Sequence, residues 1–190
     1  MRKVVAGLFI TADGVTEEPS NWQEHFDEDM GAELGKHLAE TDAILLGRVT
    51  YTYWVDYWPT QSPESDADFA HHINNTPKYV VSDTLSEVHW GKFNTVTLVR
   101  GKDLAATLDK LKQQPGKNIA VSGSPTLVRR MIEADLLDEL TLIVHPVLAA
   151  RGKRLFDGLH DLKRLDLVST RSTRMGTVFI TYHLRKPDTK

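Results

Sequence analysis

Two short apolar strands in this chain each run directly into a glycine and then into a helix, and this repeated pattern constrains the fold most. The first lies in residues 43–50, AILLGRVT, and the second in residues 119–126, IAVSGSPT. In an open α/β sheet, ligands bind where strands end and helices begin. The two segments therefore predict an α/β protein with a ligand site at the carboxyl ends of its strands.

The first of these turns has the chemistry of an anion site. Gly47 lets a ligand approach the backbone, and Arg48 offers a fork of donors. Thr50 is predicted to cap a helix whose free N–H groups and positive dipole end face the same place. A phosphate is the natural occupant. For this turn alone, an ordinary strand–helix connection with a surface arginine is the alternative.

The second turn favours the anion interpretation. Ser124 is predicted to be an N-cap and Pro125 the first residue of a helix that runs to Leu136 or Leu137. Two anion-holding turns suit a dinucleotide with its several phosphates. The chain contains neither G-x-G-x-x-G nor G-x-x-x-x-G-K-[ST], so neither a Rossmann domain nor a P-loop is supported.

Hydrophobic periodicity predicts the remaining elements. The expected strands are residues 3–11, 43–47, 78–82, 95–100, 118–122, 138–148, 165–173 and 177–184. The expected helices are residues 26–39, 50–57, 103–113 and the one that begins at residue 125. Residues 15–24 are expected to be a polar loop, and residues 60–76 a loop with a short helix. Alternating strands and helices followed by strands alone predict a mainly parallel sheet with an antiparallel C-terminal hairpin.

Composition limits the class of protein. The chain has 190 residues, 41% of them hydrophobic and 26% charged, with net charge −3 and no cysteine. This predicts one globular domain without disulfides or thiolate chemistry. No apolar run is long enough for a membrane span and the start lacks a signal-peptide pattern, so a cytoplasmic location is expected. The basic residues form no stripe, which argues against nucleic-acid binding. Adjacent His71 and His72 cannot face one ion, so no metal is expected.

Together the motifs resemble a known family. They include Asp13-Gly14, LLGRVTY at residues 45–51, YWP at 57–59, KYVVS at 78–82, GSPT at 123–126, LDEL at 137–140, and Pro146 followed by GKRLF at 152–156. Their order resembles the dihydrofolate-reductase-like superfamily. More narrowly, it resembles the C-terminal reductase domain of the bifunctional riboflavin-biosynthesis deaminase/reductase and its stand-alone bacterial relatives, over about residues 3–185.

The resemblance implies a single domain over residues 1–190, with a three-layer sandwich around a mixed, mainly parallel sheet of about eight strands. It implies an NADPH-dependent reductase of a small heterocycle, either pterin-like or ribosylaminopyrimidine-like, that acts by hydride transfer and assembles as a homodimer. The activity would be like that of 5-amino-6-(5-phosphoribosylamino)uracil reductase or dihydrofolate reductase. The implied cofactor-binding residues are Gly47, Arg48, Thr50, Ser82, Thr84, Gly123, Ser124 and Thr126.

The substrate side is expected around Asp13 and Trp22, with Asp29 as a further candidate. A carboxylate at a strand end can steer a proton to a substrate, which makes Asp13 the candidate catalytic group. The alternative is that Asp13-Gly14 only makes the turn. In the same way, an acid at the start of the first helix can bind substrate or simply be solvated near the positive dipole end. His145 is expected to be a buried, hydrogen-bonded core histidine.

The chain departs from the riboflavin reductase pattern at two places. Where those domains carry an acid before a Gly-Gly pair, this chain has Ser122-Gly123-Ser124. A protein that keeps the fold and binds a nucleotide or other ligand without turnover is therefore the alternative function. The second place is Asp83, which follows Ser82, near the expected position of a 2′-phosphate. The negative charge of Asp83 is unfavourable for a phosphate there unless the Asp83 side chain points away.

Overall fold

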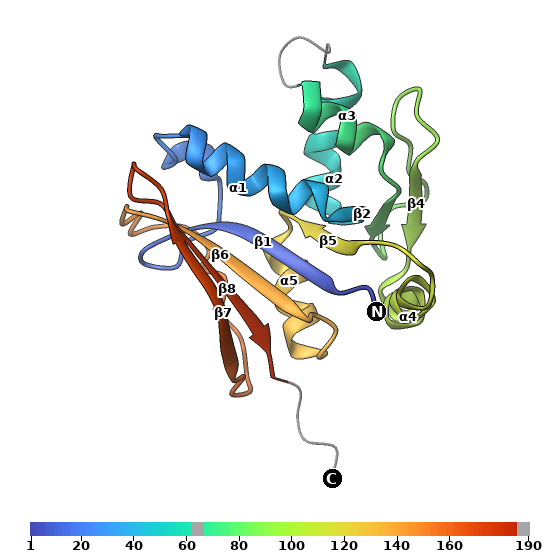
Figure 1. Ribbon diagram of the computed structural model, residues 1–190. Helices are drawn as coiled ribbons and strands as arrows, with labels where there is room; N and C mark the ends of the chain where they lie inside the picture. Colours follow the sequence, from blue (N-terminus) through green and yellow to red (C-terminus); the bar gives the residue numbers. More distant parts are fainter. Residues whose placement is uncertain (62–66, 186–190) are drawn as a thin grey trace. The chain divides into compact units, whose positions relative to one another are not determined.

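The computed structural model describes residues 1–61 and 67–185; of the domain predicted over residues 1–190, residues 62–66 and 186–190 lie outside this part. The described chain has eight strands and five α-helices in the predicted mixed α/β arrangement (Figure 1). The strands are β1 (Val4–Thr11), β2 (Thr41–Gly47), β3 (Lys78–Val81), β4 (Val96–Val99), β5 (Asn118–Ser122), β6 (Glu139–His145), β7 (Leu165–Ser172) and β8 (Val178–Leu184). The helices are α1 (Glu28–Ala39), α2 (Arg48–Val55), α3 (Ala67–Asn75), α4 (Leu104–Gln113) and α5 (Pro125–Glu133).

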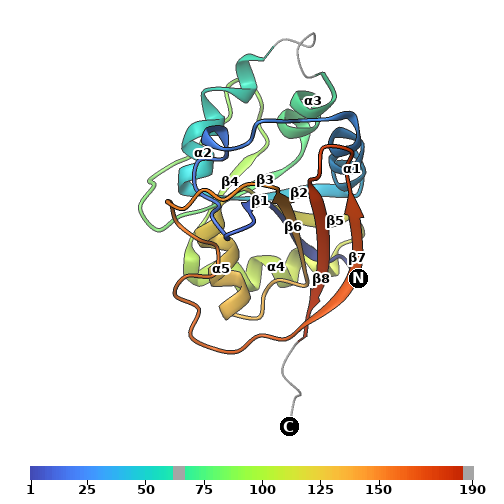
Figure 2. The same cartoon turned by 90° about the vertical axis from the view of Figure 1, so that its left-hand side faces the viewer.

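The chain divides into two compact units. Unit 1 comprises residues 1–3 and 38–124, and unit 2 comprises residues 4–37 and 125–190. Unit 1 holds four parallel strands in the order β4-β3-β2-β5. Helices α2 and α3 lie on one face of these strands and α4 on the other, as both views show (Figures 1 and 2). A strand covered on both faces needs apolar side chains on both, which explains the nearly unbroken burial of β2.

The core of unit 1 forms where α2 and α3 cover the strands. Its buried members are Ile44, Leu46, Tyr51, Ile73, Val80 and Trp90. The Tyr51 hydroxyl donates to the His89 carbonyl at 3.2 Å and accepts the His89 N–H at 3.0 Å, so this buried ring keeps its polar end satisfied. Trp54 and Trp58 pack against the same core, so these two rings and Tyr51 are packing residues.

Unit 2 holds the remaining strands in the order β1-β6-β8-β7. β1 and β6 are parallel, with Thr11 opposite His145, whereas β6–β8 and β7–β8 are antiparallel, as the predicted hairpin requires. Helix α1 covers one face through Met30, which packs with Ile143 and Phe179. Helix α5 lies on the opposite face (Figures 1 and 2).

Two element ends differ from the prediction by three residues or more. Helix α5 ends at Glu133 rather than at 136 or 137, because Asp135 adopts φ +53 and the Leu136 N–H returns to the Met131 carbonyl. This left-handed residue with a six-to-one hydrogen bond is a helix-ending motif that usually uses glycine, so no residue pattern marks Asp135 as the end of the helix. Strand β6 ends at His145, because Pro146 has no N–H for the ladder.

Candidate functional site

The turn after β2 and the turn after β5 are joined by side-chain hydrogen bonds within unit 1. The Thr50 hydroxyl oxygen accepts the Ser124 N–H at 3.0 Å and the Ser124 hydroxyl at 2.8 Å. The Gly47 N–H donates to Ser124 Oγ at 2.8 Å. A hydroxyl has one proton to donate, and Thr50 uses only its acceptor capacity here. Ser124 Oγ also lies 3.2 Å from the Ser122 carbonyl oxygen. When the Ser124 hydroxyl donates to Thr50, the Thr50 proton remains for a ligand.

Gly123 lies beside this hydroxyl pair. Its φ is +55°, in the left-handed region that favours glycine, and Ser124 follows with φ +58°. A Cβ atom on Gly123 would lie only 3.1 Å from Thr50 Cγ2. The backbone therefore favours glycine, and a side chain here would need Thr50 to shift by a few tenths of an ångström. Left-handed non-glycine residues such as Ser124 are strained and concentrate at ligand sites, which makes this turn a candidate site.

The N-terminus of α2 leaves donors for an anion. The helix begins at Arg48 with Gly47 at its N-cap, and no side chain caps its first turn. The prediction that Thr50 caps this helix is wrong, because Thr50 lies inside the helix and its hydroxyl bonds Ser124. The first-turn N–H groups and the positive dipole end thus remain for a ligand. The Arg48 side chain is exposed and makes no hydrogen bond or ion pair within the described residues.

Ser82 builds the turn that follows β3. Its buried hydroxyl accepts the N–H of Thr84 at 3.2 Å and that of Leu85 at 3.1 Å, and it lies 3.3 Å from Thr84 Oγ1. Thr84 itself is exposed. Of the two residues predicted to lie near the adenosine ribose, Ser82 therefore shapes the turn and Thr84 presents its side chain to the outside.

The side chain of Arg100, which was not among the predicted site residues, also contacts this turn. Arg100 follows β4, and its Nη1 donates to the carbonyls of Ser82 at 2.9 Å and Leu85 at 2.7 Å. The Asp83 carboxylate accepts the Gly101 N–H at 2.8 Å and so is directed to the segment after β4. The only sequence signal for Arg100 was its place at the end of a predicted strand.

Asp13 anchors the loop after β1 in unit 2. Its carboxylate accepts the Thr11 hydroxyl at 2.6 Å and the N–H groups of Ala149 at 3.1 Å and Ala150 at 2.9 Å, and Arg154 lies 3.6 Å away. The Thr11 bond and the two backbone N–H bonds hold the pKa of Asp13 below its usual value. Asp13 is therefore ionised at neutral pH and poorly suited to give up a proton.

Trp22 and His145 lie against each other in the same unit. The Trp22 ring meets the His145 ring edge to face at 5.4 Å, and its Nε1 donates to the Glu17 carbonyl at 2.9 Å. Phe9 packs on His145 at 5.3 Å. Burial of His145 is confirmed, but its Nε2 is enclosed without a hydrogen-bond partner among the described residues. Burial also lowers the pKa of His145, which favours the neutral ring.

Asp29 is held by one arginine. Its carboxylate accepts the Arg174 N–H at 3.1 Å and pairs with the guanidinium at 3.0 Å and 3.1 Å. This partner holds the pKa of Asp29 below its usual value. The contacts join the start of α1 to the turn between β7 and β8, so the first-turn acids of α1 are more than a solvated helix end.

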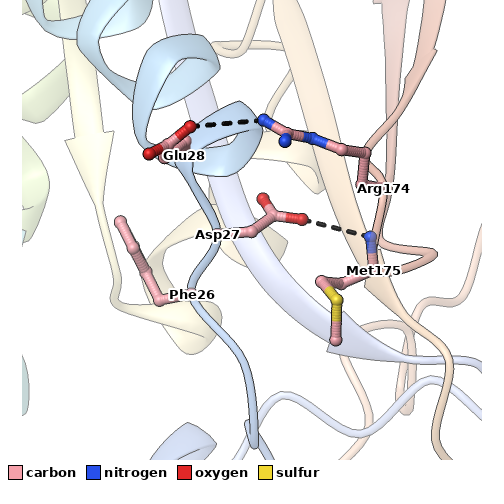
Figure 3. A pocket seen from close by; sticks show the side chains of 5 residues that line it. All are labelled: Phe26, Asp27, Glu28, Arg174 and Met175. Carbon is pink, nitrogen blue, oxygen red and sulfur yellow. Dashed lines mark hydrogen bonds and ion pairs between the residues drawn. The ribbon is translucent and has the colours of Figure 1, made fainter.

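A pocket of about 380 Å³ opens beside this junction. It is lined by Phe26, Asp27, Glu28, Arg174 and Met175 (Figure 3). Asp27 accepts the N–H groups of Met30 at 2.8 Å and Met175 at 3.1 Å, so it caps α1 and fixes the hairpin. The apolar side chains of Phe26 and Met175 are largely exposed, so they contribute apolar surface to the pocket.

The structure thus groups the predicted residues unevenly. Gly47, Thr50, Gly123 and Ser124 form one cluster with Arg48 beside it. Thr126 is an exposed residue in the first turn of α5. Among the described residues, Asp13, Trp22 and Asp29 share no hydrogen bond, ion pair or ring contact with one another. Their roles at a site remain predictions.

The described ranges, 1–61 and 67–185, contain neither a candidate metal site nor a candidate membrane span. Neither range brings three or more His, Asp or Glu side chains together in a way that could hold a metal ion. No helix in them combines the length and apolar character needed to cross a membrane.

Comparison with known proteins decides the family. The profile of the RibD C-terminal domain matches residues 2–179. The chain belongs to the RibD C-terminal domain family. A relative of this chain is YyaP of Bacillus subtilis (strain 168), an uncharacterised protein. The two are 30% identical over 185 residues, which cover 96% of this chain and 95% of YyaP.

Solved structures with little sequence identity share the fold of this RibD C-terminal domain. One is from Shewanella sp. PV-4 and is named for riboflavin biosynthesis; it has a TM-score of 0.76 at 19% identity and covers 97% of this chain and 99% of its own. Another is dihydrofolate reductase from Enterococcus faecalis, solved with NADP(H), with a TM-score of 0.62 at 14% identity and 97% of each chain covered. The predicted dihydrofolate-reductase-like fold is confirmed.

Proposed function

We propose that this protein is an NADPH-dependent reductase of a small heterocyclic substrate, pterin-like or ribosylaminopyrimidine-like. The observation that carries the proposal is the hydroxyl pair of Thr50 and Ser124, which joins two strand-to-helix turns beside an uncapped helix start. Membership of the RibD C-terminal domain family supports the reductase class. The E. faecalis dihydrofolate reductase of the same fold was solved with NADP(H), which supports the choice of cofactor.

The residues present fit a nicotinamide dinucleotide. A pyrophosphate needs several donors and positive potential, and the first-turn N–H groups of α2, the Arg48 guanidinium and the Thr50 hydroxyl proton offer both. Gly47 and Ser124 already bond each other, so they act by holding Thr50 and the helix start in place. Gly123 keeps the approach open, because any side chain there would press on Thr50.

The turn after β3 favours NADPH over NADH. Asp83 is bonded to Gly101, and Arg100 brings a guanidinium to the turn through its bonds to Ser82 and Leu85. Nη1 of Arg100 makes both carbonyl bonds, so the other guanidinium N–H groups can meet a 2′-phosphate. The exposed Thr84 hydroxyl offers a further donor at the same turn.

The substrate side is assigned to unit 2. When bound, NADPH supplies a hydride from its nicotinamide ring, and the protein has to orient the substrate and exclude water. The ionised Asp13 has a positioning role. It accepts the N–H groups of residues 149 and 150 and so fixes the loop after β1, which helps to orient the substrate. Trp22 offers an apolar wall, and Asp29 holds the start of α1 through Arg174. The proton that completes the reduction is then taken from another donor than Asp13.

Three broader expectations belong to the same proposal. The enzyme acts in the cytoplasm on a small molecule, without nucleic acid or membrane as partner. It works as a homodimer, which the exposed strand β7 supports. The chain forms one domain.

Two measurements test the proposed function. Titration of NADPH against intrinsic tryptophan fluorescence is expected to give saturable quenching, and the absence of quenching at millimolar NADPH would contradict cofactor binding. NADPH oxidation is then followed with dihydrofolate, ribosylaminopyrimidines and small carbonyl compounds. Turnover with one of them supports the reductase. Binding without any turnover supports the alternative, a ligand-binding protein that keeps the fold.

A further inference from the structure

The imidazole of His145 makes no hydrogen bond among the described residues, although His145 is only 4% exposed and its Nε2 is fully enclosed. A buried polar atom without a partner costs free energy, and in a native protein it calls for a functional explanation. Thr11 lies opposite His145 in the register of β1 and β6. It does not supply the missing bond, because its hydroxyl donates to Asp13 and accepts the Val15 N–H.

His145 stands where α/β proteins bind ligands. It is the last residue of β6, which is parallel to β1, so it lies at the carboxyl ends of both strands. Ligands of open α/β sheets bind outside these ends. The Asp13 carboxylate follows β1 at the same place, but it is already bonded to two backbone N–H groups. His145, by contrast, has hydrogen-bonding capacity that the described residues leave unused.

Two aromatic rings contact the imidazole, and they differ in how firmly they are held. Phe9 meets the His145 ring edge to face at 5.3 Å and Trp22 at 5.4 Å. Phe9 belongs to strand β1 and packs against the core under α1. Trp22 is half-buried and lies on the loop after β1. A ligand that reaches the enclosed Nε2 therefore displaces Trp22 rather than Phe9.

The loop segment of residues 18–25 is bonded mainly to itself. Among the described residues, its hydrogen bonds and ion pairs all run between residues 17 and 25, and none of its residues is buried. The segment begins at Glu18 with φ +46°, a left-handed conformation that is uncommon for a residue other than glycine. Exposed segments with few bonds to the rest of the fold open at low free-energy cost. This segment can therefore carry Trp22 away from His145.

We propose that His145 Nε2 hydrogen-bonds a polar group in the plane of the substrate ring, a ring nitrogen or a ring carbonyl, after the substrate has displaced the Trp22 ring. The inference rests on the proposed function and names the residue that recognises the heterocycle. His145 transfers no proton in this role. Burial lowers its pKa and favours the neutral ring, which offers one N–H donor and one acceptor nitrogen.

A hydrogen bond from a buried imidazole selects substrates by the chemistry of the ring edge. A site built to hydrogen-bond its substrate rejects an analogue without the matching group more strongly than an apolar pocket rejects an analogue of another size. An apolar arene of the same size would leave Nε2 of His145 enclosed and without a partner. The site therefore favours heterocycles with a polar edge over such an arene.

Binding of heterocycles in the absence of NADPH tests the contact. Protein with ¹⁵N-labelled histidine is titrated with 5,6-diaminouracil and 7,8-dihydropterin, and with naphthalene as the apolar control. Both heterocycles should shift the ring ¹⁵N resonances of His145, which are assigned as those that His145→Phe removes. Naphthalene should leave them unshifted. The resonances of His160, an exposed histidine, should stay constant in all three titrations.

Tryptophan fluorescence tests the displacement. The two heterocycles should change the intrinsic fluorescence, and Trp22→Phe should abolish this change. Trp54→Phe, which alters a packed ring in unit 1, should retain it. His145→Phe should weaken heterocycle binding by about tenfold or more, because the hydrogen bond is lost. His145→Gln offers an amide donor and acceptor at this place and should recover part of the affinity.

The outcomes separate this inference from the proposed function. The inference would be overturned if neither heterocycle binds at millimolar concentration, or if they bind without affecting the His145 resonances and the Trp22 fluorescence. Equal affinities of the wild type and His145→Phe would overturn it as well. Binding at His145 without any NADPH oxidation would leave the inference in place and contradict the reductase.

Discussion

The Thr50 and Ser124 hydroxyls lie 2.8 Å apart and join two turns that are 74 residues apart in the sequence. The Ser124 N–H points to the same Thr50 oxygen at 3.0 Å, so this one acceptor satisfies two donors. Through these bonds the two residues affect ligand binding even without contacting the ligand themselves. They fix the α2 start relative to the turn after β5.

Removing this acceptor should lower stability and cofactor affinity together. Thr50→Val keeps the shape but leaves the Ser124 N–H without its acceptor and leaves the Ser124 hydroxyl only the Ser122 carbonyl at 3.2 Å, so the free energy of unfolding should fall by about 1–3 kcal/mol. NADPH affinity should fall as well. The control is Thr52→Val on the exposed side of α2, where the hydroxyl only returns to the Arg48 carbonyl. If both variants behave alike in urea unfolding and NADPH titration, the hydroxyl pair has no special role.

Arg48 should act on binding alone. Arg48→Ala removes a charge-assisted bond of about 1.5–3 kcal/mol, so the Kd for NADPH should rise about ten- to a hundredfold. The melting temperature should hardly change, because the side chain is exposed and makes no bond within the described residues. Equal losses for NADPH and NADH place Arg48 on the shared pyrophosphate. An unchanged Kd with a lower melting temperature would show that Arg48 is structural. Arg130→Ala, another exposed arginine, serves as the control.

Arg100 should distinguish the two cofactors. Arg100→Leu removes the guanidinium beside the Ser82 turn, so NADPH should lose roughly tenfold more affinity than NADH. Some stability is lost with the two carbonyl bonds, but that loss is common to both cofactors. The ratio of the two dissociation constants, measured by fluorescence, therefore isolates the 2′-phosphate contact. A ratio equal to that of the wild type would remove Arg100 from this role.

The elements of the fold could be predicted because each leaves a local pattern. In α4, Leu104, Leu108 and Leu111 recur at helical spacing and are all buried. The hairpin of β7 and β8 follows from two alternating segments around Gly176, whose φ is +86°. The end of α5 was missed, because a left-handed Asp135 looks like any surface residue in the sequence.

The site could be predicted only in part, for a related reason. Glycine and the residues after it mark the two turns, but no local pattern says that Thr50 will bond Ser124 instead of capping its helix. The position of Arg100 depends on the pairing of β3 with β4, which brings residues 18 apart together. His145 Nε2 lacks a hydrogen-bond partner among the described residues, and this depends on every side chain packed around the ring. Long-range geometry decides all three.

The buried Lys78 should make the free energy of unfolding depend on pH. It is buried at the start of β3, where its Nζ donates to the carbonyls of Ile73, Asn74 and Thr76 and lies 4.7 Å from the Trp90 ring centroid. Burial lowers the pKa of Lys78 to about 8. Between about pH 8 and pH 10.5 the unfolded chain therefore holds a proton on this group that the folded protein has lost, so its contribution to stability rises with pH.

The variant Lys78→Met should remove that rise. At pH 7 the loss of three donors should cost about 1–3 kcal/mol of unfolding free energy. From pH 8 to pH 10 the wild type should gain stability relative to the variant, by about 1–3 kcal/mol. Urea unfolding across this range measures the difference. A constant difference between the two proteins would show that the three carbonyls and the Trp90 ring keep the ammonium charged.

Substitution of His145 should impair substrate binding without lowering the melting temperature. Its Nε2 is buried without a partner among the described residues, and such a group costs free energy unless it serves another purpose. His145→Phe fills a similar volume between Phe9 and Trp22 without the polar atom, so the melting temperature should stay the same or rise. If the imidazole contacts substrate at the strand end, KM for the substrate should rise while the Kd for NADPH stays unchanged. Phe179→Leu, a change of another buried ring in unit 2, controls for packing and should lower stability without this split. A His145→Phe protein with wild-type KM and kcat would show that the ring only packs the core.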